Sequence, residues 1–265
     1  MATFGFIGMG NMGYAILKGL LKEYMPAELL FSDGNAERMA AVTAETGVAH
    51  TDSNAACVSR SKYVILAVKP QQYEIVLKSI VNILTPDHIL ISIAPGITIG
   101  ELKQKLGVDR RIVRAMPNTP ALIGEGMTGA CYDRDAFTAQ EQEVIKGFFE
   151  SFGKVQFVEE KLMDAVVCAS GSSPAYVYLF IEALADGVVK QGMPRATAYE
   201  MIAQTLIGSA RMVLETGEHP GRLKDQVCSP GGTTIAAVAA LEEYGFRNAL
   251  IKASDACDAA CKKFS

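Results

Sequence analysis

A glycine-rich turn near the start of the chain is the first feature that could do chemistry. An apolar segment from Phe4 to Ile7 runs directly into the spacing Gly8-x-Gly10-x-x-Gly13. Between a strand and a helix, such glycines permit a tight bend, close approach of the backbone to a pyrophosphate, and close packing of the helix. The free amides in the first helical turn would face the phosphates. The spacing therefore predicts a dinucleotide-binding turn, and the alternative is a glycine turn without a ligand.

The residues after this turn favour the dinucleotide interpretation. Apolar residues from Ile16 to Tyr24 recur at helical spacing, and a second apolar strand, Leu29 to Phe31, is followed by Asp33. An acidic residue in this place can accept a hydrogen bond from a ribose hydroxyl of the dinucleotide.

Three further segments end apolar strands with rigid or small turns. Prolines fix the direction of the backbone and glycines admit close approach, which suits contact with a flat nicotinamide ring. Ordinary loop turns are the alternative. The segments are Ala67-Val68-Lys69-Pro70-Gln71, Ala94-Pro95-Gly96 and Met116-Pro117-Asn118-Thr119-Pro120.

A late turn, Ser229-Pro230-Gly231-Gly232-Thr233-Thr234, leads into an apolar helical segment. Unblocked backbone amides and two hydroxyls converge there at the positive end of a helix. This combination predicts an anion site of the size of a carboxylate. The alternative is a turn between helices with a threonine as its N-cap.

The elements that must position these turns follow a strand–helix alternation. We expect an α/β fold: a Rossmann-type doubly wound parallel sheet over residues 1–158, followed by an all-α helical domain over residues 159–265. Thr98 with Glu101, and Thr138 with Glu141, match the spacing of capping boxes at helix starts. Ligands should bind at the carboxyl ends of the strands. The expected strands are 4–7, 29–32, 63–68, 89–93, 112–116, 127–131 and 155–158.

The second part of the chain is predicted to be helical. Ser173-Pro174 is a typical helix start, and Gly192 a typical stop. Tyr176 to Ile181 is apolar on every side but too short for a membrane span, since Glu182 follows. We expect this helix to be buried within a bundle or between two subunits. Further helices are expected at 196–215, 235–243 and 246–263.

Composition limits the class of protein. The 265 residues carry a net charge of −4 with both signs interspersed, which argues against a nucleic-acid-binding surface. No leading segment has the features of a signal peptide, so we expect a cytoplasmic protein without a membrane anchor. The six cysteines lack paired spacing and the three histidines are far apart. Most cysteines are therefore expected to be small core residues, and neither a metal site nor a histidine triad is expected.

Five motifs are combined in this chain: Gly8-x-Gly10-Asn11-Met12-Gly13, Ala67-Val68-Lys69-Pro70, Met116-Pro117-Asn118-Thr119-Pro120, Gly171-Ser172-Ser173-Pro174-Ala175-Tyr176 and Ser229-Pro230-Gly231-Gly232-Thr233-Thr234. Together they resemble the motifs of pyrroline-5-carboxylate reductases, over essentially the whole chain. The resemblance implies reduction of the cyclic imine 1-pyrroline-5-carboxylate to L-proline by a reduced nicotinamide cofactor, the final step of proline synthesis. It also implies dimers through interlocked helical halves, commonly gathered into a ring of five dimers.

The resemblance implies a role for each motif. Residues implied to hold the pyrophosphate are Gly8, Gly10, Asn11, Met12 and Gly13, and Asn54 is implied to reach the adenosine ribose. Residues implied to border the nicotinamide are Ala67, Val68, Lys69 and Pro70, with Met116, Pro117 and Asn118 nearby. Residues implied to hold the substrate are Ser229, Gly231, Gly232, Thr233 and Thr234.

Such a reaction needs little acid–base chemistry. A protonated C=N bond is already electrophilic, so the enzyme must chiefly hold the imine carbon against the hydride-bearing carbon in near-attack geometry. We expect the amides of Gly231, Gly232 and Thr233 to hold the carboxylate, and the Thr234 hydroxyl to hydrogen-bond near the ring nitrogen. Thr234 is thus the expected catalytic residue. A six-membered cyclic imine stays open as a substrate.

The cofactor is expected to be NADPH or NADH, with a lean to NADH. Gly34 stands where a basic residue could meet the 2′-phosphate of NADPH, and Asp33 can accept a hydrogen bond from a free 2′-hydroxyl. Two alternatives are open, because Arg38 could still reach the site and Asp33 could instead cap the next turn.

Two other functions stay open. A β-hydroxyacid dehydrogenase or related imine reductase would use a lysine of the helical half as acid and base, with Lys190 and Lys224 as candidates. A nucleotide-sensing protein without catalysis would use the same fold for binding and its helical half for partner contacts. Turnover of a hydroxy acid would favour the first, and cofactor binding without turnover the second.

Overall fold

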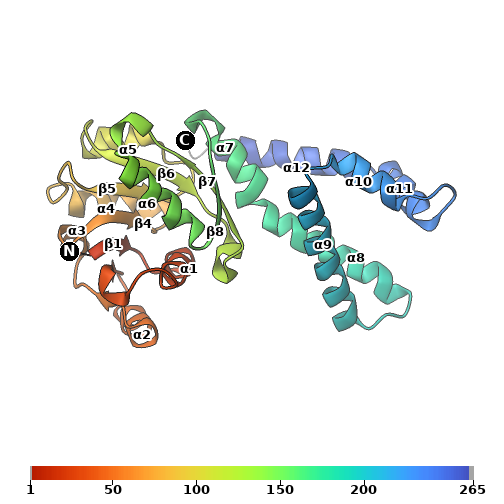
Figure 1. Cartoon of the computed structure of the whole chain (residues 1–265), viewed down its shortest axis with the longest axis horizontal. Helices are drawn as coiled ribbons and strands as arrows, with labels where there is room; N and C mark the ends of the chain where they lie inside the picture. Colours follow the sequence, from red (N-terminus) through yellow and green to blue (C-terminus); the bar gives the residue numbers. More distant parts are fainter. Residues whose placement is uncertain (1, 263–265) are drawn as a thin grey trace. The chain divides into compact units, whose positions relative to one another are not determined.

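The computed structural model describes residues 2–262 and divides into two compact units (Figure 1). Unit 1 extends to Pro174 and resumes at Cys257, and unit 2 is Ala175–Ala256. The chain therefore passes between the units twice, once after Pro174 and once before Cys257. The expected domain boundary at residue 158 lies directly after the last strand of unit 1.

One sheet of eight strands forms the frame of unit 1, in the order β3-β2-β1-β4-β5-β6-β7-β8. The strands β1 to β6 are all paired in parallel. Every expected strand is present, and β3, which has two residues, is the one strand within residues 2–262 that the sequence pattern did not predict. The strands are β1 (Ala2–Ile7), β2 (Leu29–Ser32), β3 (Ala49–His50), β4 (Ser61–Leu66), β5 (Ile89–Ser92), β6 (Arg111–Met116), β7 (Gly126–Cys131) and β8 (Gly153–Phe157).

The last two strands depart from the expected parallel order. β7 is antiparallel to β6, whereas β8 is parallel to β7. Between β6 and β7 lies only the short helix η3 (Thr119–Ile123). A connection that returns a strand in parallel needs about a dozen residues or more, so this shorter segment turns the chain back on itself. The longer helix α6 (Ala139–Glu150) precedes β8 and restores the parallel direction.

Alternation along β1 separates two cores on opposite faces of the sheet. Phe4 and Phe6 belong to a buried cluster with residues of α6 and of α1 (Asn11–Leu20). Ile7 belongs to a second cluster with residues of α4 (Tyr73–Ile80) and α5 (Ile99–Leu106). Because successive side chains of a strand point to opposite faces, helices must cover both sides of the sheet. The fold of unit 1 is therefore doubly wound, as predicted.

Local signals set several helix starts. The Thr98 hydroxyl accepts a hydrogen bond from the Glu101 amide at 3.1 Å, and the Thr138 hydroxyl from the Glu141 amide at 3.3 Å. Both expected capping boxes are formed. The remaining helices before α8 are η1 (Pro26–Glu28), α2 (Ala36–Thr46), α3 (Asn54–Ser59), η2 (Pro70–Gln72), η4 (Arg134–Ala136), η5 (Glu160–Leu162), α7 (Met163–Val166) and the π-helix η6 (Val167–Gly171).

The rest of the described chain is helical, as predicted. Its helices are α8 (Ser173–Lys190), α9 (Arg195–Thr216), α10 (Pro220–Val227), α11 (Thr233–Glu243) and α12 (Phe246–Cys261). The predicted end of the last helix at Lys263 lies outside the described residues. Within residues 2–262, no helix combines the length and the apolar character that crossing a bilayer requires.

Unit 2 has a small core of its own. Ala185, Ala198 and Ile202 are buried in it. On α8, by contrast, Tyr178 is 60% exposed and Leu179 is 65% exposed. The expected burial of this apolar helix is therefore not met within a single chain, and much of its apolar surface faces outward.

Candidate active site

A groove in unit 1 lies where β1, β2 and β4 end, as the fold predicts for a ligand site. Its volume is about 790 Å³. Seven of the predicted cofactor residues line it: Gly8, Gly10, Asp33, Asn54, Ala67, Val68 and Lys69. Other lining residues are Ile7, Ser32, Gly34, Asn35, Asp52, Ser53, Ala55, Gln72, Val76 and Ser79.

Each glycine of the first turn has a different structural setting. Gly8 has φ of 97°, which disfavours any side chain, and a Cβ there would lie 2.7 Å from the Ala67 carbonyl oxygen. A Cβ at Gly13 would lie 2.5 Å from the Gly8 carbonyl oxygen. At Gly10 a Cβ would meet nothing within 4 Å, so the space beside this residue is open to the groove. This is the pattern expected where a phosphate approaches the backbone.

The start of α1 carries no side-chain cap. Gly10 is its N-cap residue, and Asn11 and Met12 form the first helical positions. The first amides of a helix have no partner within the helix, so an uncapped start favours an anion. Asn11, Met12, Gly13 and Pro70 are not among the residues that line the groove. Asn11 and Pro70 directly follow lining residues in the chain, and Gly13 lies against the Gly8 carbonyl.

Both backbone polar groups of Met9 are hydrogen-bonded to side chains. Its amide donates to Asp33 Oδ2 at 2.6 Å, and its carbonyl accepts from Arg38 Nε at 2.9 Å. The other carboxylate oxygen of Asp33 accepts from the Asn35 amide at 2.9 Å. The guanidinium of Arg38 also lies over the Tyr14 ring, 4.8 Å from its centroid. Asp33 therefore fixes the glycine turn to the end of β2, a role that sequence analysis missed.

Polar side chains connect the floor of the groove to two helices. The Ser32 hydroxyl donates to Asn54 Oδ1 at 2.9 Å, and Asn54 Nδ2 donates to the Ser79 hydroxyl at 3.2 Å. Asn54 is the first residue of α3, and Ser53 caps that helix by accepting from the Ala56 amide. Asn54 is thus held in place at the groove, and Ser32 and Ser79 are polar lining residues that sequence analysis did not identify.

The segment after β6 lies outside this groove. Asn118 is only 8% exposed, and its side chain accepts from the Met127 amide at 2.8 Å and donates to the Ser170 carbonyl at 3.0 Å. A Cβ at Gly171 would lie 2.7 Å from Met116 Cε. Met116 and Asn118 therefore adjoin the π-helix η6, and Asn118 ties that helix to the sheet.

The predicted substrate turn lies in unit 2, at the start of α11. Gly231 has φ of 68°, and the Gly232 amide donates to the Ser229 carbonyl at 3.0 Å. The N-cap residue is Gly232, without a side-chain cap, so the alternative of a threonine N-cap is wrong. Thr233 and Thr234 are the first two helical residues. No side chain occupies the start of α11, although the Gly232 amide is bonded within the turn.

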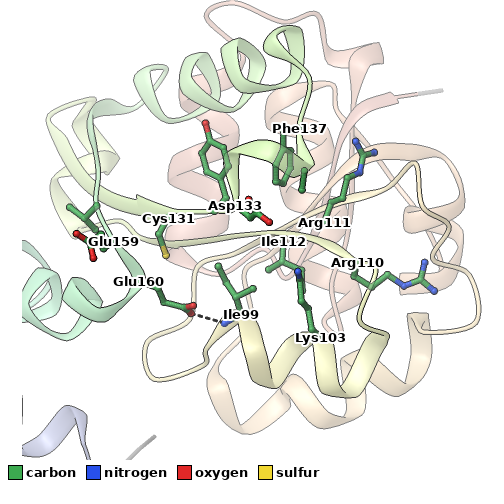
Figure 2. Close-up of a pocket in the computed structure, with 13 residues that line it drawn as sticks. Ile99, Lys103, Arg110, Arg111, Ile112, Cys131, Asp133, Phe137, Glu159 and Glu160 are labelled. Carbon is green, nitrogen blue, oxygen red and sulfur yellow. Dashed lines mark hydrogen bonds between the residues drawn. The ribbon is translucent and has the colours of Figure 1, made fainter.

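A second cavity in unit 1, of about 270 Å³, shares no residue with the groove. Charged groups near it are bonded to one another. In Figure 2 a dashed line joins Glu160 to the backbone amide of Ile99, at 2.7 Å, and Glu160 also pairs with the buried Arg114 at 3.3 Å. These bonds hold the segment after β8 against α5 and β6. The charged groups beside this cavity therefore serve to hold elements of the fold together.

The lysines considered for a dehydrogenase mechanism have ordinary surroundings. Lys224 pairs with its neighbour Asp225 on the surface of α10. That ion pair raises the pKa of Lys224, which disfavours a neutral lysine base. Lys190 is the exposed last residue of α8.

Comparisons with known proteins agree over both units. Residues 160–264 match a family model for pyrroline-5-carboxylate reductase dimerisation, and residues 3–96 match one for NADP oxidoreductase, coenzyme F420-dependent. The chain is 46% identical to the pyrroline-5-carboxylate reductase of Escherichia coli (strain K12), over 98% of this chain and 97% of that protein. It is 41% identical to the one from Methanosarcina acetivorans, over 95% of each.

Solved structures show the same similarity. The pyrroline-5-carboxylate reductase of Coxiella burnetii superposes with a TM-score of 0.92 at 34% identity, covering 100% of this chain and 98% of that one. The Plasmodium falciparum enzyme, solved with NADP bound, gives a TM-score of 0.89 at 32% identity, covering 99% and 98%. Sequence, family models and fold thus coincide over nearly the full length, and the chain belongs to the pyrroline-5-carboxylate reductase family.

Proposed function

We propose that the protein reduces 1-pyrroline-5-carboxylate to L-proline with NADH or NADPH, as the last step of proline synthesis. The observation that carries this proposal is the pair of glycine turns that open α1 and α11, each at a helix start without a side-chain cap. One turn suits the pyrophosphate of a dinucleotide and the other the carboxylate of a small substrate. The reaction needs both anions to be held.

The residues of unit 1 fit a nicotinamide dinucleotide. The open space beside Gly10 admits a phosphate, and the bonds from Asp33 and Arg38 hold the turn in shape. Asn54 is held at the groove by Ser32 and is proposed to bind the adenosine ribose. When bound, the reduced nicotinamide supplies the hydride for the imine carbon. Ala67, Val68, Lys69 and Pro70 are proposed to border its ring, with Met116, Pro117 and Asn118 nearby.

The turn of unit 2 is proposed to hold the substrate. The amides of Gly231, Gly232 and Thr233 bind its carboxylate, with Ser229 beside them, and the Gly232 amide exchanges its bond to the Ser229 carbonyl for one to the substrate. The Thr234 hydroxyl bonds near the ring nitrogen. These groups orient a substrate that is already electrophilic when protonated, so no strong general acid is required. The main task of the chain is to position two bound molecules.

We infer a preference for NADH over NADPH. Asp33 lines the groove beside Gly34, and a 2′-phosphate there would meet its negative charge. Among the described residues that line the groove, Lys69 alone is basic, and it follows β4 and not β2. Arg38 is directed to the Met9 carbonyl and the Tyr14 ring. The Michaelis constant should therefore be lower for NADH than for NADPH, and a lower value for NADPH would contradict this inference.

Unit 2 is proposed to form a homodimer, with five dimers gathered into a ring. Its exposed apolar side chains include Tyr178, Leu179, Met201 and Leu214, and a surface of this kind is typical of a subunit interface. The match of residues 160–264 to the dimerisation family supports the same assignment. Light scattering on the purified protein measures the mass, and a monomer would contradict the dimer.

The direct test of the function follows cofactor oxidation by absorbance. With 1-pyrroline-5-carboxylate as substrate, we expect steady turnover with NADH and with NADPH. A six-membered cyclic imine carboxylate tests the width of the site, and a β-hydroxy acid with oxidised cofactor tests the dehydrogenase alternative. Turnover of the hydroxy acid without the imine would overturn the proposal, as would cofactor binding with no turnover at all.

A further inference from the structure

Three cysteines from two distant parts of the sequence come together in unit 1. Cys168 lies in η6, and Cys257 and Cys261 lie near the end of α12. The thiol of Cys257 is hydrogen-bonded to those of Cys168 and Cys261, and Cys257 Sγ lies 3.4 Å from the Ser172 hydroxyl. All three cysteines are half-buried, and none is in a disulfide bond. The expectation that these cysteines are core residues is therefore wrong.

This cluster lies where the chain passes between the two units. Cys168 comes shortly before the first crossing, which follows Pro174, and Cys257 is the first residue after the second crossing. A covalent bond between these two cysteines would close the whole of unit 2, Ala175–Ala256, into one loop. It would also attach α12 to η6, the helix that Asn118 ties to the sheet through Ser170.

We propose that Cys168 and Cys257 form a reversible thiol–disulfide site that takes low-molecular-weight disulfides, such as oxidised glutathione, as oxidant. One cysteine thiolate attacks the reagent, which forms a mixed disulfide and releases one reduced thiol. The second cysteine thiolate then displaces the other reduced thiol, and the Cys168–Cys257 bond forms. The two cysteines lose two electrons and two protons, and the reagent takes up both.

The pairing of Cys168 with Cys257 is favoured over pairing within α12. Cys257 and Cys261 are one helical turn apart on the same helix, where Cβ atoms lie about 5 to 6 Å from each other. A disulfide needs Cβ atoms about 3.5 to 4.5 Å apart, so this pair could close only by distorting the helix. The Cys257 thiol is hydrogen-bonded to both Cys168 and Cys261, so contact alone does not select the pair. Cys168 lies on a separate helix, so the fixed spacing within α12 does not limit its approach to Cys257.

Exchange at this site is expected to be slow at neutral pH. Burial, together with the hydrogen bond and charge of Cys257, raises the pKa of the Cys168 thiol to about 11. Thiolate is the reactive form, so the rate of cross-linking should rise up to roughly tenfold per pH unit between pH 7 and pH 9. The other titratable groups that face the cluster are Cys261, Asp164, Asp258 and Lys262.

Peptide mapping of the full-length protein tests the assignment. The protein is incubated with oxidised glutathione at pH 8.5, blocked with an alkylating reagent, digested without reductant and analysed by mass spectrometry. The expected product is a peptide pair joined through Cys168 and Cys257 that disappears after treatment with dithiothreitol. A link from either cysteine to Cys261, or glutathione adducts on these cysteines without an internal link, would overturn the proposal.

Matched serine variants separate this site from general thiol chemistry. Cys261→Ser should keep the cross-link, whereas Cys168→Ser and Cys257→Ser should lose it. In the wild type, oxidation should raise the urea midpoint by about 1 to 2 M, because the bond closes a long loop. After reduction, the urea midpoint should return to its value before oxidation. A shift of equal size in Cys168→Ser would contradict the assignment, whether or not the protein reduces the imine.

Discussion

The carboxylate of Asp33 accepts a hydrogen bond from the backbone amide of Met9 at 2.6 Å, which joins the end of β2 to the turn that opens α1. Arg38 bonds the carbonyl of the same residue at 2.9 Å. Two charged side chains of the protein itself thus hold the turn in shape. A turn that is already ordered loses less conformational freedom when the dinucleotide binds, which favours affinity.

Asp33→Asn is predicted to weaken cofactor binding. An asparagine offers one carbonyl oxygen, whereas Asp33 accepts from two amides, those of Met9 and Asn35. Losing a hydrogen bond to a charged group costs about 1.5 to 3 kcal/mol, so the KM for NADH should rise roughly tenfold to a hundredfold. Steady-state kinetics measures this, with kcat expected within about threefold of wild type because uniform binding is lost. The exposed Asp109 provides the control, Asp109→Asn, and an unchanged KM in Asp33→Asn would exclude the role of Asp33.

Gly10→Ala is predicted to impair binding without impairing folding. The added methyl meets nothing within 4 Å in the protein, and φ of −72° suits alanine. Stability should therefore be unchanged or rise by up to about 1 kcal/mol. The same methyl occupies the space proposed for the pyrophosphate, so the cofactor KM should rise about tenfold or more. Steady-state kinetics and urea unfolding on one preparation test the predicted effects on binding and on stability. An unchanged KM would show that the pyrophosphate does not bind at this position.

Gly13→Ala makes the same chemical change with the opposite expected result. Its methyl would lie 2.5 Å from the Gly8 carbonyl oxygen, so α1 must move away from the turn. Overpacking of this kind costs about 1 to 3 kcal/mol. The urea midpoint should fall clearly below that of Gly10→Ala. Equal midpoints for the two variants would show that α1 does not need this close approach.

Glu141 is predicted to make stability depend on pH. The residue is 6% exposed; burial alone would raise its pKa, but hydrogen bonds from Lys62, the Thr138 amide and Arg111 lower the pKa to about 2. The folded pKa is thus below the unfolded one, so the contribution is complete above about pH 4.5 and is lost as the pH falls toward 2. A shift of this size corresponds to about 3 kcal/mol.

Urea unfolding of wild type and Glu141→Gln between pH 7 and pH 3 measures this contribution. At pH 7 the variant should be less stable by about 3 kcal/mol, since an uncharged side chain bonds Lys62 and Arg111 more weakly. The difference should shrink below about pH 4.5, where Glu141 of the unfolded wild type takes up a proton while that of the folded protein stays charged. A difference that stays constant over this range would contradict the assigned pKa.

Asn118→Ala is predicted to destabilise the contact between the sheet and η6. The substitution removes the partners of the Met127 amide and the Ser170 carbonyl. Leaving such groups unpaired costs about 1 to 3 kcal/mol. The urea midpoint should fall accordingly, whereas Asn248→Ala, at an exposed position of α12, should change stability by less than about 0.5 kcal/mol. Equal effects in the two variants would show that the Asn118 bonds contribute nothing.

Local signals in the sequence were enough to predict much of the fold. The capping boxes at Thr98 and Thr138 depend on residues three positions apart, and the turn from Gly8 to Gly13 depends on backbone sterics within one motif. Interactions between residues so close in the chain leave a pattern that can be recognised in the sequence. The direction of β7 depends instead on the length of a connection, which becomes visible only once the strand ends are known.

Long-range contacts could not be predicted in the same way. Asp33 was identified as acidic, but its bond to Met9 joins residues from different strand ends. Cys168 and Cys257 meet only because α12 returns to unit 1 after the whole of unit 2. No spacing rule links such residues, because their contact is created by tertiary packing.

The efficiency of Thr234 variants tests the central claim that the turn before α11 binds the reacting imine. The measurement is kcat/KM with 1-pyrroline-5-carboxylate for wild type, Thr234→Ser and Thr234→Ala at saturating cofactor. Loss of the hydroxyl should cost about 1 to 3 kcal/mol, which lowers kcat/KM in Thr234→Ala by roughly one to two powers of ten. Thr234→Ser should stay close to wild type. Full efficiency in Thr234→Ala would contradict the account.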